Sequence, residues 1–378
     1  MRVPFSYLNR QFKASAPGEK EQILDVILAD IKTFVQTGDF TLGKKGEEFE
    51  KKFASFVGVR HAIGVNSGTD ALFLSLKALG IGPGDEVITC AETFIATAAA
   101  IAATGARPVF VDVNDEYTID HDLIEGAITE RTKAIMPVWF TGNAPDMEKI
   151  LAIAARHGLS VVEDSCTAVN AAYKDRHAGT FGIAGAFSFH PLKNLNVWSD
   201  GGMIVTDDDR LNEKLRMLRN YGLKSRDEVE LFGYNSRLDT LQAVVALRLL
   251  PDVKACTDRR IAIAEAYDRA LCRIPQIDVP RRNPDVRHVY HLYMIRGEDR
   301  DGLLRYCEGR GVEAKIHYPL PLPYQNCCRD LGYKPGDFPR TERDCQSIIT
   351  LPAHPYLTDD EVDYTIETVA SFYGARVA

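Results

Sequence analysis

The chain has 378 residues, of which 45% are hydrophobic and 26% charged, and its formal net charge is −8. This length supports a large buried core, and the acidic balance argues against nucleic acid or an anionic membrane as the main partner. The first residues lack the apolar run of a signal peptide, and no stretch is apolar enough to span a bilayer. We therefore expect a cytoplasmic protein whose eight cysteines, which show no paired spacing, are reduced.

Two amphipathic helices are expected at the start of the chain. The first covers about Glu19 to Thr37, and the second covers residues 43–58, with Phe49, Phe53 and Phe56 at helical spacing. Strand and helix patterns then alternate, which predicts a mostly parallel sheet covered by helices on both faces. The expected strands are 61–65, 85–90, 107–113, 133–140, 159–164, 185–190 and 201–208, and the expected helices are 69–80, 93–105 and 146–158.

The pattern changes after about Arg237. Helical patterns cover residues 238–250 and 259–274, strand-like runs cover 288–295 and 313–319, and a capping signal opens a final helix over 358–374. We therefore expect a large domain over residues 1–250 and a small C-terminal α+β domain over residues 251–378.

Three short segments at the ends of expected strands carry residues suited to a binding site. "NSGTDAL" opens a helix, and Ser67, Gly68 and Thr69 are placed to bind a phosphate there, although an ordinary helix N-cap has the same pattern. "VVEDSCTA" ends a strand with Glu163 and Asp164, which point to opposite faces and therefore need not cooperate. One acid at a strand end is suited to hold a protonated ring nitrogen, although an aspartate that caps a helix has the same pattern. "ETFIATA" supplies Phe94, an aromatic ring for stacking or for core packing.

The segment "SFHPLKNLNVWSDGG" places Lys193 between two expected strands. A single lysine is usually solvent-exposed, but an imine-forming lysine has to be desolvated and aimed at a carbonyl. Ser188 is a further phosphate candidate, and Gly201 and Gly202 allow a close approach of the backbone. Together the four segments supply a lysine, a carboxylate, an anion site and an aromatic face, which are the groups that a pyridoxal phosphate (PLP) pocket needs.

Nine ordered segments across nearly the whole chain resemble the DegT/DnrJ/EryC1/StrS family of PLP-dependent sugar aminotransferases. They include "FTLGKKGEEFEKKFASFVGVRHAIGVNSGTDAL", "GIGPGDEVI", "GTFGIAGAFSFHPLKNL", "GYNSRLDTLQA" and "KIHYPLPLP". The resemblance implies fold type I of the PLP transferases, which is aspartate aminotransferase-like. In that fold a mostly parallel mixed sheet is covered by helices and followed by a smaller C-terminal α+β domain.

The resemblance also assigns site residues. It implies that Lys193 forms the imine, that Asp164 partners the ring nitrogen, and that Phe94 stacks on the ring. It implies a phosphate site made of Gly68, Thr69 and Ser188. Asn235 matches an asparagine that reaches the neighbouring subunit's cofactor phosphate, which implies a homodimer with shared active sites.

One position departs from the family pattern, because Thr167 stands where the family usually has a glutamine that contacts the cofactor's ring hydroxyl. The contact of Thr167 with the cofactor is therefore open. His190 lies close to the lysine without an assigned role. His317 and Tyr318 are expected near the substrate, although the end of a structural strand has the same pattern. Candidates for contact with a diphosphate are Lys224, Arg226, Arg237 and Lys315.

The implied reaction moves an amino group, expected to come from L-glutamate, to a keto sugar. The resemblance favours a nucleotide-linked keto-hexose aminated at C3 rather than C4, in polysaccharide or antibiotic amino-sugar biosynthesis. Three alternatives stay open: an aminotransferase for a cyclitol or another ketone, a PLP-dependent sugar dehydratase, and a non-catalytic regulatory protein on the same fold. No metal is expected, since His288 and His291 have no further ligands at suitable spacing, and no GxGxxG motif indicates NAD.

Overall fold

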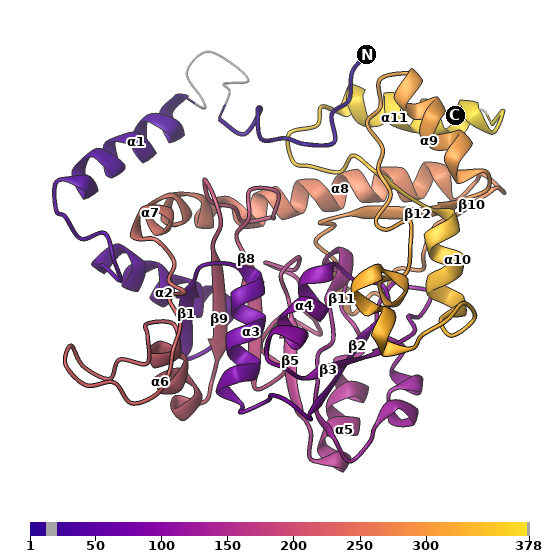
Figure 1. Cartoon of the computed structure of the whole chain (residues 1–378). Coiled ribbons are helices and arrows are strands. Elements are labelled where there is room, and N and C mark those ends of the chain that lie inside the picture. Colours follow the sequence, from indigo (N-terminus) through magenta and orange to yellow (C-terminus); the bar gives the residue numbers. More distant parts are fainter. Residues whose placement is uncertain (13–20, 376–378) are drawn as a thin grey trace.

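The computed structural model describes residues 1–12 and 21–375. A seven-stranded sheet lies at its centre (Figure 1). The strand order is β1-β9-β8-β5-β4-β2-β3, and β9 alone runs antiparallel to its neighbours. The expected mostly parallel mixed sheet is therefore confirmed. The strands are β1 (His61–Val65), β2 (Glu86–Cys90), β3 (Arg107–Val111), β4 (Thr132–Ile135), β5 (Ser160–Asp164), β8 (Ala184–Ser188) and β9 (Gly202–Thr206).

Helices cover both faces of this sheet because its strands are apolar on both sides. In β2, Val87 packs with the helices of one face and its neighbour Ile88 with the helix of the other, as the two-residue period of a strand requires. One face carries α3 (Gly68–Ala78), α4 (Ile95–Ala103) and α6 (Asp209–Leu218). The opposite face carries α2 (Lys44–Val57), α5 (Met147–His157) and α7 (Thr240–Leu249).

The first helix, α1 (Glu21–Val35), has the expected position, but the start predicted at Glu19 lies outside the described residues. In α2, Phe49 and Phe53 are fully buried and Phe56 is half-buried, in agreement with their predicted helical spacing. Residues 1–12 pack against the C-terminal part of the chain. Val3 belongs to its core, and its N–H donates to the carbonyl of Gly311 over 2.8 Å.

A second sheet of three antiparallel strands lies in the C-terminal part, in the order β10-β12-β13. Its core is shared with the helices around it, and a separate small sheet, β11-β6-β7, joins both parts of the chain. The proposed domain division at residues 250 and 251 stays a prediction. The strands are β6 (Ala172–Tyr173), β7 (Arg176–His177), β10 (Ile277–Asp278), β11 (Val286–Arg287), β12 (Tyr293–Gly297) and β13 (Ile348–Leu351), and the helices are α8 (Val253–Leu271), α9 (Arg300–Gly309), α10 (Pro339–Ser347) and α11 (Asp359–Phe372).

The predicted capping signal of the last helix is confirmed. The Thr358 hydroxyl accepts from the Glu361 N–H over 3.2 Å, and the Glu361 carboxylate accepts from the Thr358 N–H over 3.0 Å. Two predicted strands differ from the structure. The run 288–295 enters a strand only at Tyr293, because the N–H groups of Val289 and Leu292 donate to the carbonyls of Gly142 and Thr141 over 3.1 and 3.3 Å. The run 313–319 pairs through a single bridge between Lys315 and Thr350.

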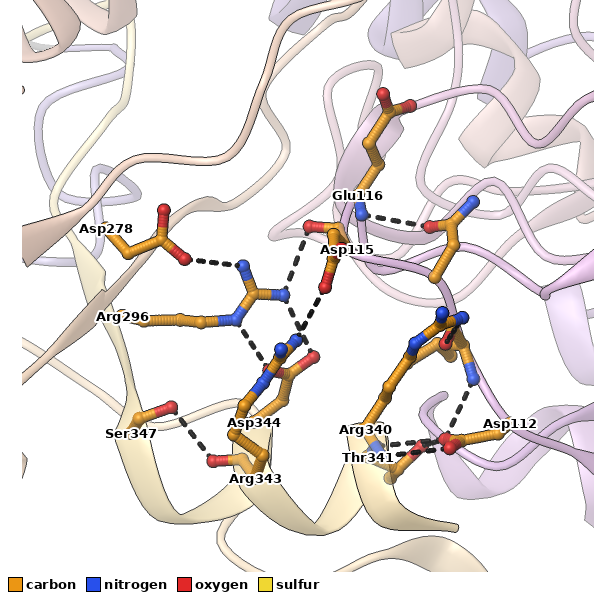
Figure 2. A network of polar contacts seen from close by, with 12 residues as sticks. Asp112, Asp115, Glu116, Asp278, Arg296, Arg340, Thr341, Arg343, Asp344 and Ser347 are labelled. Carbon is orange, nitrogen blue, oxygen red and sulfur yellow. Dashed lines mark hydrogen bonds and ion pairs between the residues drawn. The ribbon is translucent and has the colours of Figure 1, made fainter.

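A polar network joins the end of β3 to the C-terminal part (Figure 2). The buried pair of Arg296 and Asp344 is bidentate, with N···O distances of 2.6 and 3.1 Å, and Arg343 links Asp344 to Asp115. Asp112 binds the first turn of α10 and is 5% exposed. The network fixes α10 relative to the sheet through charge-assisted hydrogen bonds.

Replacing Asp112 by alanine should lower the free energy of unfolding by about 2 kcal/mol, because buried donors at a helix N-terminus lose their acceptor. Its carboxylate accepts from the N–H groups of Arg340 and Thr341 over 2.9 Å each, and from the Thr341 hydroxyl over 2.6 Å. Chemical denaturation measures the change. Asp227→Ala, at an exposed aspartate, is the matched control, and an equal loss in both variants would contradict the prediction.

Among the described residues, no helix is both long and apolar enough to cross a membrane. The cytoplasmic location stays a prediction. Across residues 1–12 and 21–375 no disulfide joins the cysteines, and the Sγ atoms of the adjacent Cys327 and Cys328 lie 3.8 Å apart.

Candidate active site

Lys193 lies in the loop that joins β8 to β9, and hydrogen bonds fix the backbone of this loop. The Lys193 N–H donates to the His190 carbonyl over 2.8 Å, and the Tyr7 hydroxyl donates to the Lys193 carbonyl over 2.8 Å. Gln11 and Asn196 exchange two amide hydrogen bonds of 2.8 Å. The N-terminal segment therefore holds the lysine loop in place, a contact across more than 180 residues that local sequence patterns do not reveal.

The glycine pair after the lysine allows β9 to start beside the first turn of α3. A Cβ atom on Gly202 would lie 2.2 Å from the Ser67 carbonyl oxygen, and one on Gly201 would lie 2.9 Å from the Leu238 side chain. Only glycine fits at position 202, as expected from the predicted close approach. Because β9 opens here, Lys193 and the N-terminus of α3 lie at the same edge of the sheet.

The first turn of α3 presents its backbone to this edge. Ser67 is the N-cap, and its hydroxyl accepts from the Asp70 N–H over 3.1 Å. A Cβ atom on Gly68 would lie 2.7 Å from the Ser188 Cβ and 2.8 Å from the Cys166 Sγ. The first N–H groups of a helix lack intrahelical acceptors, so Gly68 and Thr69 offer donors for an anion.

Asp164 ends β5 and is buried, with both carboxylate oxygens bound. The Thr97 hydroxyl donates to Oδ2 over 2.7 Å, and the Cys166 N–H donates to Oδ1 over 3.2 Å. Thr97 lies in the first turn of α4 and is 1% exposed. These contacts orient the carboxylate at the carboxyl end of its strand, where open α/β sheets form their sites.

Glu163, the neighbouring carboxylate, serves the structure of the sheet instead. It accepts from the Trp139 indole N–H over 2.9 Å and from three backbone N–H groups of residues 179–182 over 2.6 to 2.9 Å. Burial raises the pKa of Glu163, while these donors oppose the shift. The prediction that the two adjacent carboxylates face different ways agrees with these separate partners.

A cavity of about 340 Å³ opens at this edge of the sheet. It brings together the predicted catalytic, cofactor and substrate residues except Asn235, and it contains none of the four basic residues predicted to contact a diphosphate. Asn235 is exposed in the loop before α7 and accepts from Arg237 over 2.5 Å. The predicted residues that line the cavity are Gly68, Thr69, Phe94, Asp164, Thr167, Ser188, His190, Lys193, His317 and Tyr318.

Aromatic rings form one wall of the cavity. Phe94 is 55% exposed, and its ring centroid lies 6.2 Å from that of Tyr318, which is 6.3 Å from that of Phe140. Burial raises the pKa of Tyr318 to about 12 and lowers that of His317 to about 4. Tyr318 is therefore a neutral phenol and His317 a neutral imidazole at physiological pH.

Lys193 has a lowered pKa because burial disfavours its charged form, although Cys166 and Asp164 act in the opposite direction. None of the hydrogen bonds found within residues 1–12 and 21–375 involves its Nζ atom. A larger fraction of neutral amine at neutral pH is what a nucleophilic lysine requires.

Several cavity residues were not predicted as site residues. Thr97 lies within the "ETFIATA" segment, three residues after Phe94, and that spacing placed it one helical turn from the site. Cys166 lies in the "VVEDSCTA" segment without an assigned role, Phe140 carries no motif signal, and His291 is considered in the sequence only as a metal ligand. The further lining residues include Asp200, Leu192 and Thr93.

The described residues contain no group of three His, Cys, Asp or Glu side chains placed to hold a metal ion. The basic candidates for diphosphate contact are absent from the cavity lining. The Nζ atom of Lys224 lies 3.6 Å from Oε1 of Glu228, and the Cζ atom of Arg237 lies 5.5 Å from the centroid of the Tyr221 ring. Lys315 and Arg226 are exposed, so their role stays a prediction.

The chain is similar to known proteins over nearly its whole length. A family model, the DegT/DnrJ/EryC1/StrS aminotransferase family, matches residues 21–370. A pleiotropic regulatory protein of Geobacillus stearothermophilus is 40% identical, with 99% of each chain covered. A dTDP-3-amino-3,4,6-trideoxy-alpha-D-glucose transaminase of Streptomyces venezuelae is 40% identical, with 97% of this chain and 95% of that one covered.

A solved structure, NtdA from Bacillus subtilis with the bound cofactor PMP, superposes with a TM-score of 0.90 at 32% identity, covering 98% of this chain and 85% of that one. The cavity fits the same type of cofactor. It offers a lysine with a depressed pKa, a carboxylate already oriented by Thr97, and a helix N-terminus beside Gly68, where any side chain would clash.

Proposed function

Because the chain belongs to the DegT/DnrJ/EryC1/StrS aminotransferase family, we propose that it moves an amino group from L-glutamate to C3 of a nucleotide-linked keto-hexose. That it is a PLP-dependent sugar aminotransferase of fold type I follows from the family and its relatives. The donor, the sugar and the aminated carbon are the proposal. The cavity shared by Lys193, Asp164 and the aromatic wall is the observation that carries the amino transfer, and the relatives named for 3-amino sugars support the aminated carbon.

PLP supplies an electron sink that stabilises negative charge on the carbon next to the transferred nitrogen. In the proposed site Lys193 binds the cofactor's aldehyde carbon, and Asp164 holds the proton on the ring nitrogen. Gly68 and Thr69, with the Ser188 hydroxyl, bind the phosphate at the N-terminus of α3. Phe94 packs over the ring from the N-cap position of α4.

The proton transfer falls to Lys193. With the cofactor and an amino donor bound, the Nζ amine of Lys193 would be the base that takes the proton from the donor's α-carbon. The lowered pKa keeps this amine unprotonated for a larger share of the time, as a general base near neutral pH requires. Asp164 stays fixed by Thr97 throughout.

The acceptor is proposed to lie between the aromatic wall and the lysine loop. Tyr318 is a neutral donor and His317 a neutral ring whose Nδ1 lies 2.9 Å from the Thr350 hydroxyl, so both are suited to sugar hydroxyls. Relatives named for 3-amino sugars support amination at C3. They include the Streptomyces venezuelae enzyme and a UDP-N-acetyl-3-dehydro-alpha-D-glucosamine 3-aminotransferase of Acidithiobacillus ferrooxidans.

This activity is tested by incubating the PLP-loaded enzyme with L-glutamate and then with a panel of nucleotide-linked 3-keto and 4-keto hexoses and cyclitol ketones. The proposal expects 2-oxoglutarate to form first and amine to appear on the 3-keto sugar alone. Amination of the 4-keto sugar would overturn the C3 assignment, and amination of the cyclitol alone would overturn the sugar assignment.

The regulatory alternative has support in the name of the Geobacillus stearothermophilus relative. A protein that had kept only the fold would not need both Lys193 and Asp164 in one cavity, so this chain favours an enzyme. Lys193 also argues against the dehydratase, in which the family replaces the lysine by histidine. Loss of water from the keto sugar without 2-oxoglutarate formation would restore the dehydratase alternative.

We propose that the enzyme is a homodimer in which Asn235 of each subunit reaches the cofactor phosphate in the site of the other subunit. The residue lies outside its own chain's cavity, exposed on a loop with Phe232 fully exposed beside it, which suits contact with a second copy. Ser236 anchors the loop next to it, because its hydroxyl donates to Asp70 in the first turn of α3 over 2.6 Å.

We expect Lys193→Ala to lose the catalytic amine and Asn235→Ala to lose a contact with the partner's cofactor phosphate, so that each variant alone is impaired. Mixing the two variants should restore activity if the sites are shared. A mixed dimer has one site with an intact lysine from one subunit and an intact asparagine from the other, so random exchange gives up to about a quarter of wild-type activity. Each variant alone is the control. No recovery after verified subunit exchange would contradict shared sites.

A further inference from the structure

His291 lies in the cavity wall beside Lys193 and has no role in the mechanism above. Its Nδ1 atom is shielded from solvent and has no hydrogen-bond partner among the described residues. The other ring nitrogen, Nε2, takes part in no hydrogen bond of the described residues either, so it is the nitrogen that can meet a ligand. Buried polar groups usually have a hydrogen-bond partner, so a bound ligand is expected to supply the one that the His291 ring lacks.

The backbone places His291 next to Thr167. Gly142, with φ of +88°, lies between them: a Cβ atom there would be 3.2 Å from the Thr167 carbonyl oxygen and 3.3 Å from the His291 nitrogen. It would also lie 2.5 Å from the Val289 side chain, so only glycine allows this approach. The side chains of Thr167 and His291 therefore enter the cavity from adjoining positions of one wall.

The hydroxyl hydrogen of Thr167 is already engaged in a hydrogen bond. Its hydroxyl donates to the Trp139 carbonyl over 2.7 Å, which leaves only acceptor lone pairs for any ligand on this side. An anionic oxygen requires a donor, and a neutral imidazole has one N–H to give. His291 is the neighbouring residue of this wall that can supply it.

The charged and titratable groups around His291 keep its ring neutral. Burial lowers its pKa well below the usual range, and the positive charges of Lys193 and Arg260, with His317 and His190, act in the same direction. The ring therefore keeps a single N–H over the pH range in which the enzyme works.

In PLP the ring hydroxyl is bonded to the carbon next to the one that carries the aldehyde. A cofactor held at its aldehyde carbon by Lys193 and at its ring nitrogen by Asp164 therefore has this oxygen beside the lysine. We propose that His291 donates a hydrogen bond from Nε2 to the cofactor's ring hydroxyl oxygen, in the place that Thr167 cannot fill. This assignment rests on the proposed roles of Lys193 and Asp164.

The test is a pH titration of the visible absorption of the PLP-bound enzyme. A donor to the ring oxygen stabilises the negative charge there, so removing it in His291→Leu should raise the midpoint by about one pH unit. His291→Gln keeps an N–H donor and should restore most of the wild-type midpoint. Thr167→Val should leave the midpoint unchanged, because its hydroxyl donates to Trp139.

The outcomes separate this inference from the proposed function. A His291→Leu enzyme that holds PLP and titrates like the wild type, or a shift in Thr167→Val alone, would overturn the role of His291. Failure of the wild type to bind PLP through Lys193 would overturn the proposed site itself. Cofactor content, measured on each purified variant, shows that the titrated sample is folded and loaded.

Discussion

Lys193→Ala should lower the rate of amino transfer by about two to four orders of magnitude, to near background. In the proposed site the variant loses both the amine that binds the cofactor and the base that moves the proton. It should still bind PLP through the remaining contacts, so the loss lies in the chemical step. Single-turnover measurement of 2-oxoglutarate formation from L-glutamate gives this rate directly.

A matched control separates this effect from a general loss of charge. Lys254 is an exposed lysine at the start of α8, and Lys254→Ala should transfer amino groups at the wild-type rate. A small primary amine added to Lys193→Ala should restore part of the activity by supplying the missing base. Wild-type activity in Lys193→Ala would show that another group performs the transfer.

The pH dependence of PLP capture by the apoenzyme follows from the lowered pKa of Lys193. The neutral amine is the nucleophile, so the rate should rise with pH as the ammonium loses its proton. Because burial lowers the pKa, the rise should level off below the value of a free lysine, about 10.4. A profile that still climbs through that value would contradict a desolvated amine.

Asp164→Asn should reduce the rate by about 10² to 10³, because the carboxylate that stabilises the protonated ring nitrogen is replaced by a neutral amide. PLP should remain bound, since Lys193 and the phosphate contacts are untouched. Stopped-flow absorbance during the reaction with L-glutamate measures the change. The proposed site would be contradicted by an Asp164→Asn enzyme as fast as the wild type.

The neighbouring carboxylate provides the control, since it has the same charge but different partners. Glu163→Gln should lower the free energy of unfolding, because four donors lose a buried anionic acceptor, and should leave the rate of the folded enzyme unchanged. The reaction rate of Thr97→Val should lie between those of Asp164→Asn and Glu163→Gln, since Thr97 only positions Asp164. The opposite order would assign the functional carboxylate to Glu163.

Much of the fold is predictable because its signals are local. Alternating apolar strands and helices with a regular period predict the layered sheet, and Thr358 with Glu361 predicts the start of the last helix. The segment 288–295 is a strand only from Tyr293 onward, and 313–319 forms a single bridge, because contacts with residues far away in the sequence shape their backbones. Gly142, for example, forces close contact with Val289 and His291.

The candidate site divides in the same way. Lys193, Asp164 and Gly68 stand in segments whose composition and position at strand ends reveal them. Tyr7 and His291 reach the site through contacts between distant segments, which no local pattern contains. The partners of Thr167 are equally hidden, because its hydroxyl is bound by a carbonyl 28 residues away.

The most direct test of the account follows an isotopically labelled amino group from L-glutamate through the PLP-loaded enzyme to a nucleotide-linked 3-keto hexose. Mass spectrometry of the sugar nucleotide is the readout. The account predicts labelled nitrogen on the sugar with the wild type and none with Lys193→Ala. Label that reaches the cofactor but no sugar of the panel, or that reaches the sugar equally with Lys193→Ala, would contradict it.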